Sequence, residues 1–114
     1  MTMKHALIGL VRSVARDYGR RGVRVNAVCP GWVRTAMADE QMAELVRRRG
    51  LAGVEAAYDL VTRDVPLGRP ATAQEVADAV LFLASPRAAM ITGTSLLVDG
   101  GASAVDLPTL AFAD

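Results

Sequence analysis

Apolar side chains recur at helical spacing along the first part of the chain, and Arg12, Arg16 and Asp17 fall largely on the other face. The pattern predicts an amphipathic helix over roughly Thr2–Tyr18. We expect Gly19 to be its C-cap, because a glycine just past the last periodic position commonly ends a helix. The apolar face consists of Ala6, Leu7, Leu10, Val11, Val14, Ala15 and Tyr18.

Two short apolar runs predict buried β-strands. The first, Val23–Cys29, is rich in β-branched residues and stops at Pro30-Gly31. The second, Ser95–Asp99, lies between Gly93 and Gly100-Gly101. Continuous apolar runs of this length are typical of strands in a parallel sheet that helices cover on both faces.

The segment 38–65 between these strands is more polar, and its periodicity is looser. Helices are predicted over Asp39–Arg49 and Val54–Thr62, separated by Gly50 and Gly53. Their mixed polarity favours a mobile helical flap over a part of the hydrophobic core.

A capping box begins the next helix. In Thr72-Ala73-Gln74-Glu75, the threonine hydroxyl and the glutamate carboxylate can bond the backbone N–H groups that a first helical turn leaves unpaired. Regularly spaced apolar positions then carry the predicted helix to Ser85-Pro86, where the proline ends it.

The predicted order of helix, strand, helical flap, helix and strand indicates an α/β fold with a parallel sheet. Two strands are too few for such a sheet, since about three or more are needed for independent stability. We therefore expect the 114 residues to be incomplete as a domain. Either sequence outside this chain or another chain supplies the missing strands, and the first explanation is the simpler one.

Composition and charge narrow the classes of function. A hydrophobic fraction of 52% and a formal net charge of +1 are typical of a soluble globular protein, and they give no reason to expect a nucleic-acid or membrane partner. The single cysteine, Cys29, has no partner for an intrachain disulfide or a metal site, which favours a reducing, cytoplasmic setting. No apolar stretch reaches the roughly 18 uncharged residues of a membrane span.

Four segments, in this order and at these separations, resemble the C-terminal half of the classical short-chain dehydrogenase/reductase family. They are Lys4–Leu10, Arg24–Thr35 with its Pro-Gly-Trp-Val-Arg-Thr turn, Pro66–Arg69 before the capped helix, and Thr92–Gly101. The resemblance implies a Rossmann-like, doubly wound parallel sheet. Residues 1–114 would form its C-terminal part, with a substrate-binding flap at 38–65.

In that family a tyrosine stands four residues before the catalytic lysine, one helical turn away on the same face. Carried onto this chain, that position lies immediately before Met1, so we expect the chain to be truncated upstream of its catalytic lysine. Tyr18 and Tyr58 have no lysine four residues later and are not candidates. The serine that polarises the substrate carbonyl and the glycine-rich phosphate loop are also expected upstream.

Lys4, the only lysine of the chain, is the candidate catalytic residue. The resemblance implies that its ammonium binds the nicotinamide ribose hydroxyls and lowers the pKa of the tyrosine. A compact ammonium with three donors suits two neighbouring hydroxyls better than a planar guanidinium does. The alternative is an ordinary surface lysine at a helix start.

Pro30, Gly31, Val33 and Thr35 are, with Lys4, the candidate cofactor-binding residues. They follow a predicted strand at the edge where open α/β sheets bind ligands, and Gly31 allows the backbone to approach a ring closely. The resemblance implies that Val33 main-chain groups and the Thr35 hydroxyl hold the nicotinamide carboxamide. The alternative is a plain strand-to-helix turn with Thr35 as an N-cap.

The resemblance implies reversible hydride transfer between NAD or NADP and a small carbonyl or secondary-alcohol substrate. The choice between NAD and NADP stays open, because the residues that make it are expected near a strand outside this chain. The 114 residues alone are expected to be inactive. As an alternative, they form a non-catalytic fragment that associates with full-length subunits, which in this family are usually homodimers or homotetramers.

Overall fold

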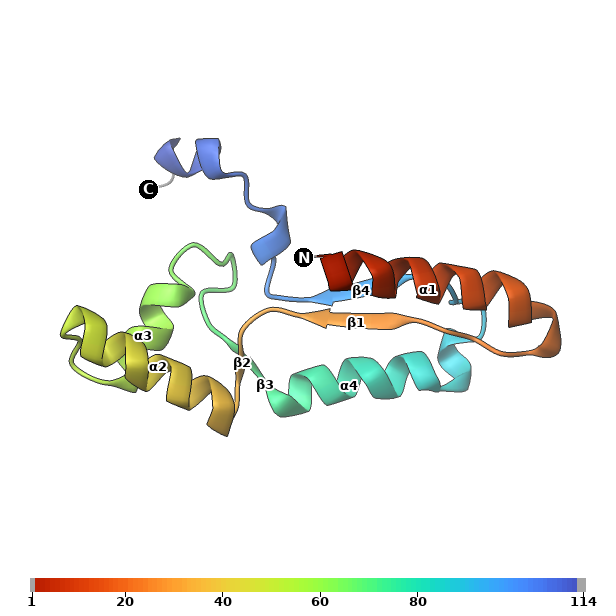
Figure 1. Cartoon of the computed structure of the whole chain (residues 1–114), viewed down its shortest axis with the longest axis horizontal. Coiled ribbons are helices and arrows are strands. Elements are labelled where there is room, and N and C mark those ends of the chain that lie inside the picture. The colour runs from red at the N-terminus through yellow and green to blue at the C-terminus, as the bar shows by residue number, and fades with distance from the viewer. Residues whose placement is uncertain (1, 113–114) are drawn as a thin grey trace. The chain divides into compact units, whose positions relative to one another are not determined.

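The computed structural model describes residues 2–112 as an α/β chain (Figure 1). Met1, next to the predicted truncation of the domain, lies outside the described residues, as do Ala113 and Asp114. The chain divides into two compact units. The first comprises the described part of Met1–Cys29 with Ala77–Leu96, and the second comprises Pro30–Val76 with the described part of Leu97–Asp114.

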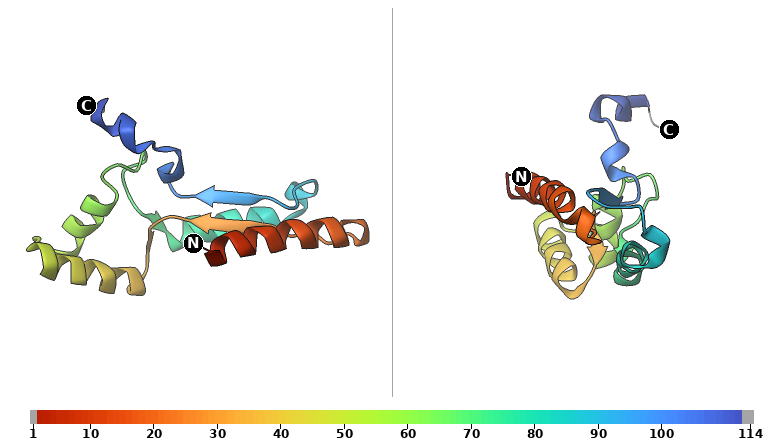
Figure 2. Two further views of the ribbon diagram at one scale, coloured as in Figure 1. Left: turned by 45° about the horizontal axis from the view of Figure 1, so that its top comes forward. Right: turned by 90° about the vertical axis from the view of Figure 1, so that its right-hand side faces the viewer.

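Helix α1 (Thr2–Tyr18) and the paired strands β1 (Ala27–Pro30) and β4 (Ser95–Val98) dominate the first unit. Hydrogen bonds run from Gly93 N to Val25 O at 2.7 Å and from Ala27 N to Thr94 O at 2.9 Å. They advance in the same direction along both strands, as in a parallel pair. Figures 1 and 2 show α1 along one face of the pair and helix α4 (Ala73–Ala84) along the other. The predicted α/β layering is confirmed.

Both strands are shorter than the apolar runs suggested, and β1 begins at Ala27 instead of Val23. Just before it, side-chain hydrogen bonds replace part of the strand ladder. Val25 N donates to Thr92 Oγ1 at 3.0 Å, and the side-chain nitrogen of Asn26 donates to Ile91 O at 3.0 Å. The strands are also mostly half-buried, not buried, since the described residues add no further strand to this sheet.

Helix α1 ends at Tyr18, as predicted. A 3₁₀ turn, η1 (Gly19–Arg21), follows it directly, and Gly22 takes the left-handed conformation at φ 80°. Its N–H bonds Gly19 O at 3.0 Å, which closes this turn. Gly22 is therefore the C-cap of η1, and Gly19, the predicted C-cap of α1, is the first residue of that turn.

The apolar face of α1 divides into a buried edge and an exposed edge. Val11 and Ala15 are buried, whereas Leu7 and Leu10 are 55% and 58% exposed. Helix and turn approach closely at Gly93, where an added Cβ would lie 3.4 Å from the Ala15 Cβ. Only the buried edge contributes to the core of the first unit.

In the second unit, β2 (Val33–Arg34) pairs in parallel with β3 (Ala71–Thr72), so that Val33 lies opposite Ala71 and Arg34 opposite Thr72. Between them come helix α2 (Ala36–Arg49) and helix α3 (Val54–Val61).

These two flap helices contain a hydrophobic cluster of their own, so the expectation that the flap adds little to the core was wrong. The mixed polarity of the sequence comes mainly from α2, since α3 has only two charged residues, Glu55 and Asp59. The apolar sides of the two helices pack together. The buried residues of the cluster are Ala38, Met42, Ala57 and Tyr58.

The predicted capping box is confirmed at the start of α4. Glu75 N donates to Thr72 Oγ1 at 3.1 Å, and Thr72 N donates to the Glu75 carboxylate at 2.8 Å. The helix ends before Ser85, which caps the short turn η2 (Pro86–Ala88). Two further 3₁₀ turns, η3 (Ala102–Ala104) and η4 (Leu107–Phe112), follow β4.

None of the helices within residues 2–112 has both the length and the hydropathy of a segment that crosses a bilayer.

Arg24 joins the segment before β1 to the end of α4 and to Ile91. Its guanidinium donates to the carbonyl oxygens of Leu83 at 2.7 Å, Ile91 at 3.2 Å and Ser85 at 3.3 Å. Two of these carbonyls belong to the end of α4 and the residue after it, where helix geometry leaves carbonyls without intrahelical partners.

We predict that Arg24→Met in the whole protein lowers the free energy of unfolding by about 1–3 kcal/mol, because these carbonyls lose a charged donor. Urea denaturation of both proteins measures the change. Arg12→Met, on the exposed side of α1, is the matched control and should change the free energy by less than about 0.5 kcal/mol. Equal effects of the two substitutions contradict the prediction.

Candidate functional site

The loop Pro30–Thr35 leaves the carboxyl end of β1 and is fixed at both ends. Near its start, Gly31 N donates to Val98 O at 3.3 Å. Farther along, the backbone of Val33 lies in register with Ala71, and Trp32 O accepts a hydrogen bond from Ala71 N at 2.9 Å. Four of the five predicted site residues, Pro30, Gly31, Val33 and Thr35, thus lie together on one loop of the second unit.

Gly31 packs closely against the end of β4. A Cβ at this position would lie 3.1 Å from the Asp99 Cβ and 3.3 Å from the Asp99 Cα. This is tighter than ordinary van der Waals contact, so a side chain here would push the loop away from the end of β4. The contact is a reason for glycine that the sequence alone did not reveal.

The Thr35 hydroxyl caps α2. Its oxygen accepts a hydrogen bond from Ala38 N at 3.1 Å, and its backbone is extended, with φ −138° and ψ 168°. The N-cap alternative from the sequence is confirmed. A hydroxyl carries two lone pairs and one proton, so capping leaves the proton of Thr35 available for a further acceptor.

Lys4 lies in the first turn of α1, and its side chain is exposed. Its ammonium forms no ion pair with another described residue. Lys4 belongs to the first unit, whereas the other four candidate residues belong to the second.

Tyr58 is buried within the flap, with 1% of its surface exposed. Its hydroxyl donates to Asp39 Oδ1 at 2.7 Å. Burial, followed by the adjacent Asp39 carboxylate, raises the pKa of Tyr58 to about 12. A tyrosine that exchanges protons near neutral pH needs the opposite shift, which agrees with its exclusion as a catalytic candidate.

Sequence reasoning missed Arg34, which lies between two predicted site residues on the loop. Its guanidinium stacks 4.7 Å above the centre of the Tyr58 ring and forms ion pairs with Glu55 and, at 3.9 Å, with Asp39. A hydrogen bond to Glu55 raises the pKa of Arg34 and lowers that of Glu55. The available signal was the alternation of side chains along Val33-Arg34-Thr35, which places Arg34 on the other side of the strand from its neighbours.

Asp99 ends β4 by bonding the turn that follows. Its two carboxylate oxygens accept hydrogen bonds from Gly101 N at 3.0 Å and Ser103 N at 2.9 Å. Hydrogen bonds from the side chain and backbone of Ser103 are the main reason that the pKa of Asp99 is lowered. Asp99 therefore shapes the turn rather than acting as a proton donor.

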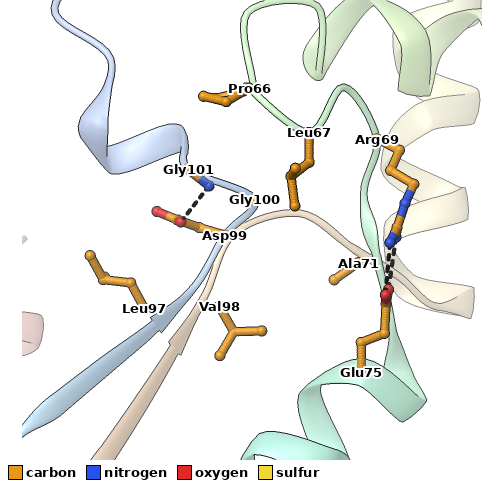
Figure 3. A pocket seen from close by; sticks show the side chains of 10 residues that line it. All are labelled: Pro66, Leu67, Arg69, Ala71, Glu75, Leu97, Val98, Asp99, Gly100 and Gly101. Atoms are coloured by element: carbon orange, nitrogen blue, oxygen red, sulfur yellow. Dashed lines mark hydrogen bonds and ion pairs between the residues drawn. The ribbon is translucent and has the colours of Figure 1, made fainter.

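A hollow of about 560 Å³ in the second unit lies against this turn (Figure 3). Arg69 and Glu75 face each other on one wall, with two nearly parallel hydrogen bonds of 2.8 Å and 2.7 Å. Arg69, followed by Thr72, lowers the pKa of Glu75 to about 2. The two charges satisfy each other, so the hollow offers a ligand mainly the apolar walls formed by Pro66, Leu67, Ala71, Leu97 and Val98.

No group of three or more His, Cys, Asp or Glu side chains within residues 2–112 is arranged to hold a metal ion.

Comparison with known proteins covers nearly the whole chain. The family model described as enoyl-(acyl carrier protein) reductase matches residues 1–103. The protein MoaE of Klebsiella aerogenes is 64% identical over 99% of this chain and 44% of its own length. The short-chain dehydrogenase RED2 of Pyricularia oryzae is 46% identical over 88% of this chain and 33% of its own length.

Among solved structures, the ligand-free aldohexose dehydrogenase of Thermoplasma acidophilum superposes with a TM-score of 0.82 at 42% identity, over 93% of this chain and 41% of that one. This likeness confirms the predicted fold class. The chain spans less than half the length of each of these relatives.

The raised pKa of Tyr58 predicts how the stability of the fold changes with pH. A phenol that has its ordinary pKa near 10 when unfolded and about 12 when folded stabilises the fold below pH 10, and this contribution is lost as the pH rises toward 12. Urea midpoints of the whole protein should therefore fall over this range. In Tyr58→Phe the fall should be smaller.

Tyr18→Phe removes an exposed phenol and serves as the control, with a decline expected to match that of the parent protein. If Tyr58→Phe and the parent lose stability in parallel over this range, the raised pKa of Tyr58 is contradicted.

Proposed function

The chain belongs to the short-chain dehydrogenase/reductase family, and from that premise we propose that the protein containing it transfers hydride reversibly between a nicotinamide cofactor and a carbonyl or secondary alcohol. The observation that carries the proposal is the loop Pro30–Thr35, anchored just past the carboxyl end of β1. Open α/β sheets bind their ligands at this edge. The choice between NAD and NADP stays open.

The residues of the loop fit the carboxamide end of a nicotinamide. Thr35 keeps its hydroxyl proton for an outside acceptor while its oxygen caps α2. Gly31 and Thr35 are exposed, so their groups are accessible. We assign the Thr35 hydroxyl and the main chain of Val33 to hold the carboxamide, which selects the ring face that exchanges hydride. Pro30 and Gly31 shape the bend that presents them.

Lys4 supplies a positive charge beside the proton-transferring residue. Its ammonium binds the ribose hydroxyls and favours the ionised form of a tyrosine one helical turn earlier in the longer protein. At about 4 Å and an effective dielectric constant near 20, a cation contributes roughly 4 kcal/mol before desolvation is counted. That corresponds to about three pKa units, which brings a phenol near pKa 10 toward neutrality.

We assign the flap, residues 38–65, to the substrate. Its helices α2 and α3 follow directly from Thr35, so their placement is tied to the loop that holds the nicotinamide. Their cluster around Tyr58 gives the flap a packed interior and a defined shape. A small carbonyl or alcohol is the class of substrate that the family resemblance implies. A reducing, cytoplasmic location is in keeping with the single cysteine.

Replacement of Lys4 tests the assignment. In the whole protein, Lys4→Met should lower kcat/KM by about 1,000-fold, since roughly 4 kcal/mol of stabilisation of the ionised tyrosine is lost. Lys4→Arg should recover only part of the activity, because a planar guanidinium matches two neighbouring hydroxyls less well. Loss of absorbance of NADH and NADPH with a panel of ketones and aldehydes measures the rates.

Arg12→Met, on the same helix, is the control and should leave the rate unchanged. A whole protein that oxidises neither cofactor with any carbonyl compound overturns the proposed function. An active protein in which Lys4→Met loses less than about threefold overturns the role given to Lys4.

The isolated 114 residues should show no such activity, because they contain no tyrosine four positions before Lys4 and no serine or glycine-rich phosphate loop in the family's positions. The measurement is cofactor oxidation by the purified chain, verified by mass. Oxidation at the rate of the whole protein contradicts the expectation.

The same sample tests a second candidate role, association with full-length subunits. The exposed Leu7 and Leu10 on α1 favour it, since they offer apolar surface to a partner. Co-elution with the whole protein in size-exclusion chromatography supports this role, and separate elution argues against it.

A further inference from the structure

Four side chains form a closed polar cluster on the second unit, here called the Arg34 cluster: Arg34, Asp39, Glu55 and Tyr58. They come from three elements, β2, α2 and α3. Asp39 Oδ1 lies 2.7 Å from the Tyr58 hydroxyl oxygen and 3.9 Å from Arg34 Nε, so one carboxylate oxygen serves both groups. Glu55 bonds the other end of the Arg34 guanidinium.

The cluster lies on the side of the loop that faces the flap. Side chains alternate along a strand, so Arg34 points away from the side shared by Val33 and Thr35. Thr35 is itself in the extended conformation, with φ −138° and ψ 168°, which continues the alternation. Arg34 therefore contacts Asp39, Glu55 and Tyr58 of the flap with a side chain that points away from those of its neighbours in the loop.

Stability alone does not account for the cluster. The side chains of Arg34 and Glu55 are 41% and 73% exposed, and ion pairs this accessible to water contribute little to folding. The Tyr58 ring beneath them is buried, however, and the flat guanidinium stacks on its face. The Arg34 guanidinium is paired with Glu55 and Asp39 and stacked on the Tyr58 ring. These contacts restrict the orientation of Arg34 relative to the flap more than they add stability.

We propose that Arg34 is a positioning residue, which holds the flap helices in a fixed orientation relative to the cofactor loop. The proposal rests on the proposed function, in which the loop holds the nicotinamide and the flap holds the substrate. Hydride transfer requires the two reacting carbons to be aligned, and a misplacement of about 1 Å can cost about 100-fold in rate. Arg34 touches neither reacting group and acts through the elements it joins.

The test compares two exposed, ion-paired arginines in the whole protein. Arg34→Met removes the charge and the planar fork but keeps an unbranched side chain. Arg16→Met is the control, since Arg16 lies on α1, outside the flap, and pairs at 3.3 Å with its neighbour Asp17. We expect Arg34→Met to lower kcat about tenfold while the Kd of the reduced cofactor, read from its fluorescence, changes less than twofold. Arg16→Met should change neither.

Hydrogen exchange supplies a readout that does not depend on activity. Peptides covering α2 and α3 (residues 36–61) should exchange faster in Arg34→Met than in the parent or in Arg16→Met. Arg34→Lys should recover part of kcat, because lysine can pair with Glu55 but cannot match the planar stack on Tyr58. Glu55→Gln, at the most exposed residue of the cluster, gives a milder variant should Arg34→Met fail to fold.

The outcomes separate this proposal from the proposed function. An active parent with unchanged kcat and unchanged flap exchange in Arg34→Met overturns the positioning role alone. A loss of cofactor affinity as large as that of Thr35→Val also overturns it, by making Arg34 part of the cofactor site. An inactive parent enzyme overturns the proposed function and, with it, the role of Arg34 in hydride transfer.

Discussion

At the end of β1, the backbone of Gly31 lies close to Asp99, and an added Cβ would lie 3.1 Å from the Asp99 Cβ. The hydrogen bond from Gly31 N to Val98 O keeps the chain there, and the rest of the loop follows from that anchor. Val33 comes into register with Ala71, and Thr35 then reaches the position from which its oxygen caps α2. The close approach of the Gly31 backbone to Asp99 therefore sets the point at which the flap begins.

Local signals in the sequence predicted local structure well. The bounds of α1 and the capping box of α4 follow from apolar spacing and from short-range side-chain bonds that are visible in sequence. Long-range bonds are not visible in this way. Val25 lies in the predicted strand, yet its N–H donates to the side chain of Thr92, 67 positions later, instead of to a strand carbonyl. The Arg34 cluster was missed for the same reason, since its partner Glu55 lies 21 positions away.

In the flap, a partly polar sequence forms two helices that bury a hydrophobic cluster between them. The polar residues of α2 by themselves suggest a surface element, but its apolar side packs with α3 around Met42 and Tyr58. Burial then determines the chemistry of the tyrosine. Desolvation and the adjacent Asp39 keep the Tyr58 hydroxyl neutral. This burial was not visible in the spacing on which the sequence analysis set Tyr58 aside as a candidate.

Glu75 has a consequence for how the protein responds to acid. With its pKa near 2, its carboxylate keeps its charge wherever ordinary carboxylates, with pKa values around 4, have begun to protonate. The contribution of a carboxylate with a lowered pKa is complete above its unfolded pKa and is lost only as the pH falls through the folded one. Moderate acidity therefore leaves the first turn of α4 intact. The loop from Pro66 to Thr72 stays bonded to Glu75 at pH values where carboxylates with ordinary pKa values are already neutral.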